Sequence, residues 1–234
     1  MIFEELLFPR RCPFCDEIIR GYKETCDECE SIPFRIKPPY CKKCGKHINN
    51  SDDLYCYDCS KNERSFIKGI SLYEYDSVKE SILTMKASFR PQTAEYYGKK
   101  LAEELGTELR LLNVDAIVPI PLHKKKQKKR GYNQCELMAE PLSDMLNIPI
   151  RTDLLSRVKE TKEQKKMGKN ERQNNLVGAF HMQGNDVKLN TVLLLDDVYT
   201  TGATMENATR ALHEGGVKNV YAVTAAIGAD DKRG

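Results

Sequence analysis

The chain has 234 residues, 40% of them hydrophobic, and its 37 lysines and arginines against 34 acidic residues give a formal net charge of +3. This length is enough for one substantial core plus a small module, or for two small domains. No apolar run reaches the ~20 residues of a membrane span, and the start of the chain lacks the basic and apolar regions of a signal peptide. We therefore expect a cytoplasmic protein without membrane insertion.

Cysteines dominate the first quarter of the chain, where eight of the nine form four Cys-x-x-Cys pairs. Each such turn directs two thiolates at one point, so two turns complete a tetrahedral zinc site. The spacing favours two sequential zinc ribbons, and a cross-braced arrangement of the first pair with the third is the alternative. Disulfides are disfavoured because a cytosolic chain keeps its thiols reduced. The predicted ligands of two structural zinc ions are Cys12, Cys15, Cys26, Cys29, Cys41, Cys44, Cys56 and Cys59.

This cysteine-rich segment has too few large apolar side chains to form a core without metal, so its folding and zinc binding are expected to be one event. Four sulfur ligands leave no open position, which indicates a structural or interaction role. We place a double zinc ribbon over 1–62 and a second domain over 63–234. Cys135 stands alone in a helical pattern and is expected to be a small core residue.

Beyond residue 63 the apolar pattern alternates between strand and helix periods, which is typical of an α/β fold with a parallel sheet covered by helices on both faces. The predicted strands cover 70–75, 114–118, 178–181, 191–195 and 217–224. The predicted helices cover 78–89, 92–111, 133–146 and 204–214. We expect 148–150 to be a short edge segment.

A basic run, 124–130, follows the strand at 114–118, and six of its seven residues are lysine or arginine. Ligands bind beyond the carboxyl ends of parallel strands, so this run is expected to hold a pyrophosphate or a nucleic-acid backbone. A solvated surface patch is the alternative. The candidate contacts here are Pro121, His123 and Arg130, and a turn histidine hydrogen-bonded to backbone is an equal reading of His123.

The most informative stretch is 192–204, where an apolar strand pattern leads into Asp196-Asp197 and then into a Thr-Thr-Gly-Ala-Thr turn before a helix. Such a turn offers N–H and O–H groups to an anion, aided by the helix dipole, and Gly202 permits close approach of the backbone. The acidic pair suits sugar hydroxyls or a divalent cation. The sequence thus predicts a site for a ribose 5-phosphate unit, with a purely structural strand-turn-helix as the alternative.

This stretch resembles the motif of type I phosphoribosyltransferases that binds 5-phosphoribosyl 1-pyrophosphate (PRPP). The resemblance implies a type I phosphoribosyltransferase-like parallel sheet with helices on both faces, plus the small N-terminal zinc ribbon domain. It implies that Asp196 and Asp197 hold the ribose 2′- and 3′-hydroxyls and that Mg²⁺ bridges ribose and pyrophosphate oxygens. The residues that would wrap the 5′-phosphate are Thr200, Thr201, Gly202, Ala203 and Thr204.

Residues 118–134 narrow the resemblance to the ComF family of competence-associated proteins. They read Val-Pro-Ile-Pro-Leu-His, then the basic run, then Arg-Gly-Tyr-Asn-Gln. That family joins a cysteine zinc module to a phosphoribosyltransferase domain. The family's Leu-Lys-Phe-like element is only partly matched, by Met85-Lys86 with Phe89, and Lys124 stands where members often carry proline. The resemblance implies a role in DNA uptake, with single-stranded DNA and a helicase-like competence protein as partners.

A basic segment with almost no apolar side chains, 157–175, matches further family positions. It cannot bury enough surface to order itself, and in type I phosphoribosyltransferases a mobile loop closes over PRPP. Residues 157–172 are the candidate loop, with Arg157 and Arg172 as anion clamps, and an ordinary surface loop is the alternative. Asp196, Asp197 and Arg157 are the candidate catalytic residues, should the protein be a phosphoribosyltransferase of nucleotide metabolism rather than a PRPP-binding competence protein.

Overall fold

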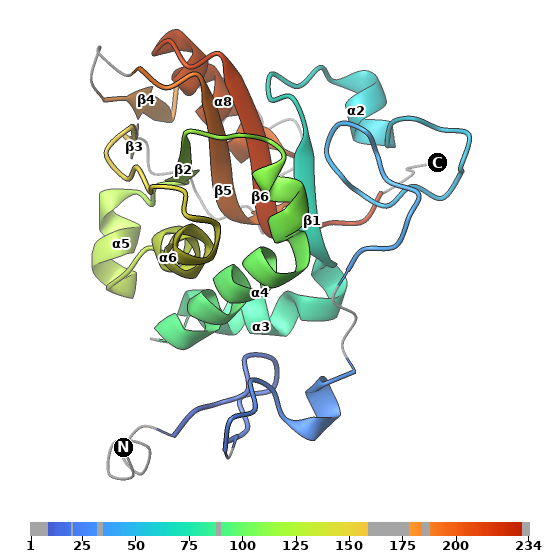
Figure 1. Ribbon diagram of the computed structural model, residues 1–234, viewed down its shortest axis with the longest axis vertical. Helices are drawn as coiled ribbons and strands as arrows, with labels where there is room; N and C mark the ends of the chain where they lie inside the picture. Colours follow the sequence, from blue (N-terminus) through green and yellow to red (C-terminus); the bar gives the residue numbers. More distant parts are fainter. Residues whose placement is uncertain are drawn as a thin grey trace.

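The computed structural model describes residues 9–19, 21–31, 35–87, 90–158, 178–183 and 188–230. At its centre lies a parallel sheet of four strands in the order β1-β6-β5-β2 (Figure 1). These strands are β1 (Gly69–Glu74), β2 (Ala116–Pro119), β5 (Thr191–Tyr199) and β6 (Asn219–Ile227). The apolar sequences of the two central strands, β5 and β6, fit burial on both faces. The predicted parallel sheet is confirmed.

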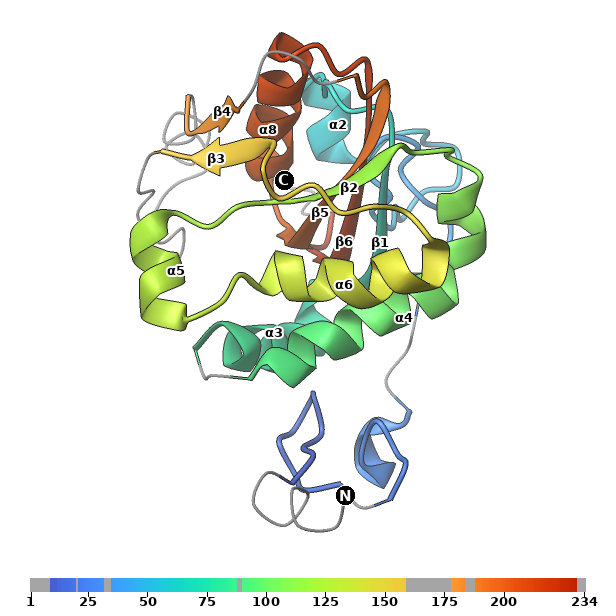
Figure 2. The same ribbon diagram turned by 60° about the vertical axis from the view of Figure 1, so that its left-hand side comes forward.

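Helices cover both faces of this sheet, as the sequence predicts (Figure 2). The helices of one face are α3 (Tyr75–Ala87), α4 (Pro91–Arg110) and α6 (Gln134–Leu146). They share a core with Leu193 and Leu195 of β5, whereas α8 (Ala203–Glu214) shares the opposite core with Val192 and Leu194. Alternate residues of a strand point to opposite faces, so β5 supplies both cores. Within the described ranges, no helix has both the length and the apolar character needed to cross a bilayer.

Two short strands outside the central sheet correct one expectation. β3 (Leu155–Arg157) and β4 (Phe180–Met182) pair antiparallel, so the strand predicted at 178–181 forms but does not join the parallel sheet. β4 lies instead against α8, where Met182 fills the space beside Gly215. The edge segment predicted at 148–150 is confirmed, since Ile150 pairs with Ile117 of β2.

The first cysteine-rich ribbon contains the short helix η1 (Asp27–Cys29) and lies against α3 and α4 (Figures 1 and 2). Its Phe14 ring makes edge contacts with the rings of Tyr73, Tyr96 and Tyr97, at centroid distances of 6.3, 5.6 and 6.4 Å. Edge-to-face packing of this kind contributes beyond the apolar area that it buries. One aromatic side chain therefore anchors the first ribbon on the α/β domain.

The second ribbon contains α2 (Tyr57–Lys61) and lies beside β1, to which backbone hydrogen bonds join it. The Gly69 N–H donates to the Lys43 carbonyl at 2.7 Å, and the Ile36 N–H donates to the Leu72 carbonyl at 3.0 Å. These bonds cross the domain boundary that the sequence places after residue 62. The boundary itself stays a prediction.

The contact between α4 and α6 gives a test of the fold. A Cβ on Gly98 would lie 2.1 Å from the Met138 carbonyl oxygen, whereas a Cβ on Gly106 would meet only side-chain ends, the nearer at 3.2 Å. We expect Gly98→Ala to lower the free energy of unfolding by about 1–3 kcal/mol through overpacking. Gly106→Ala, the matched control, should be near neutral because helix propensity favours alanine. Equal stability of the two variants in urea denaturation would contradict this packing.

Candidate functional site

The acidic pair lies at the carboxyl end of the central strand β5. Asp196 and Asp197 are 8% and 4% exposed, so neither is a surface carboxylate. Because neighbouring strand residues point to opposite faces, the two side chains meet different partners. A buried carboxylate is costly unless it is paired or hydrogen-bonded, and each of the two has such contacts.

Asp197 faces the helices α3 and α6. Its Oδ1 lies 3.0 Å from the Lys86 ammonium, and its Oδ2 accepts a hydrogen bond from the Gln134 amide at 2.7 Å. Arg130 in turn donates to the Gln134 oxygen. Burial alone would lower the pKa of Lys86, but the Asp197 carboxylate outweighs it and raises that pKa. The lysine is therefore charged and neutralises Asp197.

Asp196 faces the other side of the sheet. Its Oδ1 accepts the Asp197 N–H at 2.9 Å and lies 3.5 Å from the Cys135 sulfur. Burial, and next the charge of Asp197, raise the pKa of Asp196 to about 7. Asp196 therefore exchanges a proton near neutral pH. A ligand that donates hydroxyl groups or brings a cation would favour the charged carboxylate and so lower this pKa.

The Thr-Thr-Gly-Ala-Thr turn joins β5 to α8. Gly202 adopts the left-handed conformation at φ +77°, and a Cβ there would lie 2.2 Å from the Tyr199 hydroxyl. Position 202 therefore requires glycine for two structural reasons, its left-handed backbone and the tyrosine packed against it. The sequence predicts a third reason, the close approach of a ligand. Within the part of the chain that the structure describes, the N–H groups of Thr201, Gly202 and Thr204 donate to no protein acceptor. They lie at the positive end of α8, where the helix dipole favours an anion.

The basic run forms a short helix, α5 (Lys124–Arg130), beside α6 (Figure 2). His123 caps it, since its Nδ1 accepts the Lys125 N–H at 3.3 Å. This contact agrees with the alternative interpretation of His123, a turn histidine that is hydrogen-bonded to the backbone. Pro121 is half-buried in the connection before α5.

The stretch 130–134 ties the basic helix to the acidic pair. Gly131 ends α5 at φ +83°, and Asn133 begins α6 by accepting a backbone N–H of the first turn at 3.0 Å. Tyr132 donates its hydroxyl to the Met85 carbonyl at 2.6 Å. This bond positions the end of α3, which carries the lysine beside Asp197.

Arg157 ends β3, and its guanidinium lies 5.3 Å from the centre of the Phe180 ring. Burial lowers the pKa of Arg157, and the charges of Asp196 and Asp197 oppose that effect. The sequence predicts that the mobile loop begins at residue 157. This is wrong for Arg157, which belongs to β3 and pairs with Phe180 of β4. Arg172 and the rest of the predicted loop from 159 onward lie outside the described residues.

Sequence reasoning missed three residues that contact the acidic pair: Lys86, Gln134 and Cys135. Lys86 belongs to the partly matched Leu-Lys-Phe-like element, and Gln134 ends the Arg-Gly-Tyr-Asn-Gln stretch, so both carried a signal. Cys135 is fully buried, as predicted, and burial raises the pKa of its thiol well above the ordinary value.

The eight predicted zinc ligands form two sets of four, the first and second pairs together and the third and fourth together. The sulfur atoms of each set lie within 4.8 Å of one another. Neighbouring sulfurs are 3.4 Å apart for Cys15 and Cys26 and 3.6 Å for Cys44 and Cys56, close to the ~3.8 Å of tetrahedral zinc thiolates. The donor sets therefore fit zinc, and the sequential pairing is confirmed over the cross-braced alternative.

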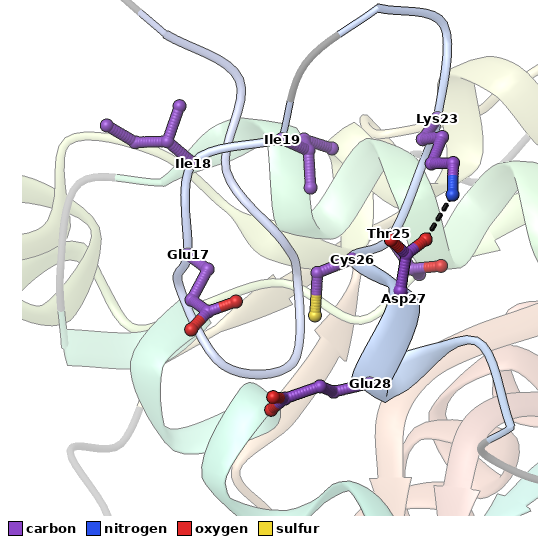
Figure 3. Close-up of a pocket in the computed structure, with 8 residues that line it drawn as sticks. All are labelled: Glu17, Ile18, Ile19, Lys23, Thr25, Cys26, Asp27 and Glu28. Carbon is purple, nitrogen blue, oxygen red and sulfur yellow. Dashed lines mark hydrogen bonds and ion pairs between the residues drawn. The ribbon is translucent and has the colours of Figure 1, made fainter.

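A hollow of about 440 Å³ lies in the first ribbon, among residues 17–28 (Figure 3). Acidic side chains line much of it, and Lys23 forms an ion pair with Asp27 across its edge. None of its lining residues belongs to the acidic pair, the turn or α5. The candidate site therefore lies elsewhere, at the carboxyl end of β5.

Comparison with known proteins agrees with this architecture. A double zinc ribbon domain model matches residues 3–60, and a phosphoribosyl transferase domain model matches residues 133–233. Competence protein F of Haemophilus influenzae is 31% identical over 224 residues, which cover 91% of this chain and 95% of that protein. The chain belongs to the ComF family. The predicted fold, a type I phosphoribosyltransferase-like domain with an N-terminal zinc ribbon, is confirmed for this ComF-family chain.

Two further relatives are similar over most of their length. Competence protein ComFC of Bacillus subtilis is 28% identical over 216 residues, covering 85% of this chain and 82% of that protein. DNA utilization protein YhgH of Escherichia coli is 26% identical over 220 residues, covering 92% of this chain and 96% of that protein.

The raised pKa of Asp196 predicts how stability depends on pH. The folded protein holds this proton up to pH ~7, whereas an ordinary aspartate loses it near 3.8, so stability should fall as the pH rises from 4 to 7. Asp196→Asn should remove that fall and make the variant more stable than the parent at pH 8. The measurement is urea denaturation across this pH range. Asp153→Asn is the control, since Arg151 lowers the pKa of this exposed carboxyl. An unchanged pH profile in Asp196→Asn would refute the assignment.

Proposed function

We propose that this ComF-family chain binds PRPP with Mg²⁺ at the carboxyl end of β5. Asp196 and Asp197 would accept the ribose hydroxyls, and the turn 200–204 would hold the 5′-phosphate on its backbone N–H groups and threonine hydroxyls. The observation that carries the proposal is the succession, along one strand, of a buried acidic pair and a turn with unused donors. The phosphoribosyl transferase domain match over residues 133–233 supports it.

The charges around the pair suit a pyrophosphate. Lys86 contacts Asp197, and the charges of both carboxylates act on Arg157. We assign both basic residues to the leaving pyrophosphate, with Pro121 and His123 as further candidates from the neighbouring strand end. Mg²⁺, when bound, would neutralise part of the pyrophosphate charge. If the protein also transfers the phosphoribosyl group, PRPP should release pyrophosphate in the presence of a nucleobase, an amine or DNA.

A PRPP titration by calorimetry tests the site directly. We expect Asp196→Asn with Asp197→Asn to weaken binding by at least about 100-fold, because hydrogen bonds to charged groups contribute ~1.5–3 kcal/mol each. The matched control is Asp52→Asn with Asp53→Asn, an adjacent acidic pair that is exposed in the second ribbon. Equal affinity in the two double variants would remove the acidic pair from the site.

We also propose that single-stranded DNA binds along α5, in keeping with relatives named for competence and DNA utilization. Lysines 124, 128 and 129 are exposed on this helix, which follows the carboxyl end of β2. The zinc ribbons would contact DNA or a helicase-like competence protein. We place the protein in the cytoplasm, where reduced thiols retain zinc.

Charge reversal tests the DNA surface. Lys124→Glu, Lys128→Glu and Lys129→Glu together should weaken single-strand binding and lower the slope of log affinity against log salt by about 2, since each phosphate contact contributes ~0.7. The control reverses three other exposed lysines, at positions 79, 188 and 218. If both triple variants lose affinity equally, α5 is not the DNA surface.

A further inference from the structure

Arg64 connects the second cysteine tetrad with the turn after β5. Its side chain is buried, with the residue 6% exposed, and its Nη2 donates to the Thr201 carbonyl at 2.9 Å. Cys59, the last ligand of that tetrad, packs against the buried cluster that contains Phe66 and Tyr199. Burial alone would lower the pKa of Arg64, but Tyr199 and Cys59 outweigh it and the pKa is raised. One buried cation thus contacts the turn from the segment that follows the tetrad.

The two residues after Arg64 also contact this region. Ser65 donates its N–H and its hydroxyl to the Glu206 carboxylate in the first turn of α8, at 2.8 and 2.7 Å. The Phe66 ring makes an edge contact with the Tyr199 ring at 6.2 Å. We call residues 64–66 the brace, since they contact the turn itself, the helix after it and the residue before it.

The bond from Arg64 determines which way the turn presents its donors. In a trans peptide the carbonyl and the next N–H point in opposite directions. Holding the Thr201 carbonyl toward the brace therefore directs the Gly202 N–H away from it, and this N–H donates to no protein acceptor among the described residues. Donors fixed before the ligand arrives bind it without an ordering cost.

We propose that the second zinc centre orders the phosphate-binding turn through Arg64, which acts as a positioning residue. Cys44, Cys56 and Cys59 of this tetrad pack in one buried cluster with Phe66 of the brace and with Tyr199. Folding of such a ribbon depends on its metal, so loss of zinc removes the packing that holds residues 64–66 in place. The turn then loses its support. The effect on ligand affinity rests on the proposed PRPP site.

The first ribbon provides an internal contrast. It lies against α3 and α4 through Phe14 and the three tyrosines, away from the turn. Arg35 also donates to a backbone carbonyl, that of Glu104 in α4. Loss of Arg35 or of the first zinc centre therefore removes similar interactions without touching residues 199–204.

The test is hydrogen–deuterium exchange of residues 199–204 in the zinc-loaded full chain. Arg64→Gln should accelerate exchange there, Arg64→Lys should do so less because it keeps the charge, and Arg35→Gln should leave exchange unchanged. Cys59→Ser should accelerate it, whereas Cys29→Ser in the first tetrad should not. Because Cys59→Ser can unfold its ribbon, Arg64→Gln decides the outcome, and exchange at 199–204 equal to the parent overturns the inference.

Calorimetry with PRPP and Mg²⁺ separates this inference from the proposed function. Arg64→Gln should bind PRPP about tenfold more weakly than the parent, the effect of one charged hydrogen bond. Failure of the parent to bind PRPP would refute the proposed function, while the exchange comparison, which needs no ligand, would still decide the role of Arg64. Full affinity in Arg64→Gln would overturn the inference alone.

Discussion

The burial of two adjacent carboxylates at the end of β5 constrains the rest of the α/β domain. An ionised carboxylate away from water costs several kcal/mol unless charge and hydrogen bonds compensate it. Lys86 comes from the end of α3 and Gln134 from the start of α6, elements far apart in the sequence. Their meeting at Asp197 requires that the end of α3 and the start of α6 lie at the same edge of the sheet.

The sheet order provides that edge. β5 lies between β6 and β2, so its carboxyl end is flanked by the ends of two other strands. The connection after β2 leads through α5 to Asn133, whose side chain caps α6 and also donates to the Ile120 carbonyl at 3.1 Å. One short stretch therefore positions the amide that bonds Asp197. The two zinc ribbons differ in their relation to the turn, because among the described residues the brace that follows the second ribbon contacts it.

The sequence predicts those features that depend on local chemistry. Cysteine spacing predicts both tetrads because each is made of neighbouring pairs, and the apolar run before Asp196 predicts a buried strand. The antiparallel pair β3–β4 could not be foreseen, since strands of three residues carry no measurable period. Helix α5 lacks an apolar face altogether, and a histidine cap with a left-handed glycine delimits it.

The partners of the acidic pair depend on tertiary packing rather than local pattern. Lys86 is one of many lysines in the sequence, and only the packing of α3, fixed by the Tyr132 hydroxyl, places it beside Asp197. Gly202 was expected to admit a ligand, and the ring of Tyr199 beneath it is a further requirement that no motif specifies. Arg64 lies just after the cysteine-rich segment, where the sequence gives no indication of its contact with the Thr201 carbonyl.

The most direct measurement is a crystal structure of the full chain grown with PRPP and Mg²⁺. We expect the 5′-phosphate on the N–H groups of residues 201–204 and the ribose hydroxyls against Asp196 and Asp197. Two results would contradict this expectation. One is PRPP bound with its phosphate away from the turn. The other is PRPP bound at full occupancy while Asp197 keeps its contacts with Lys86 and Gln134 and neither carboxylate contacts the ribose.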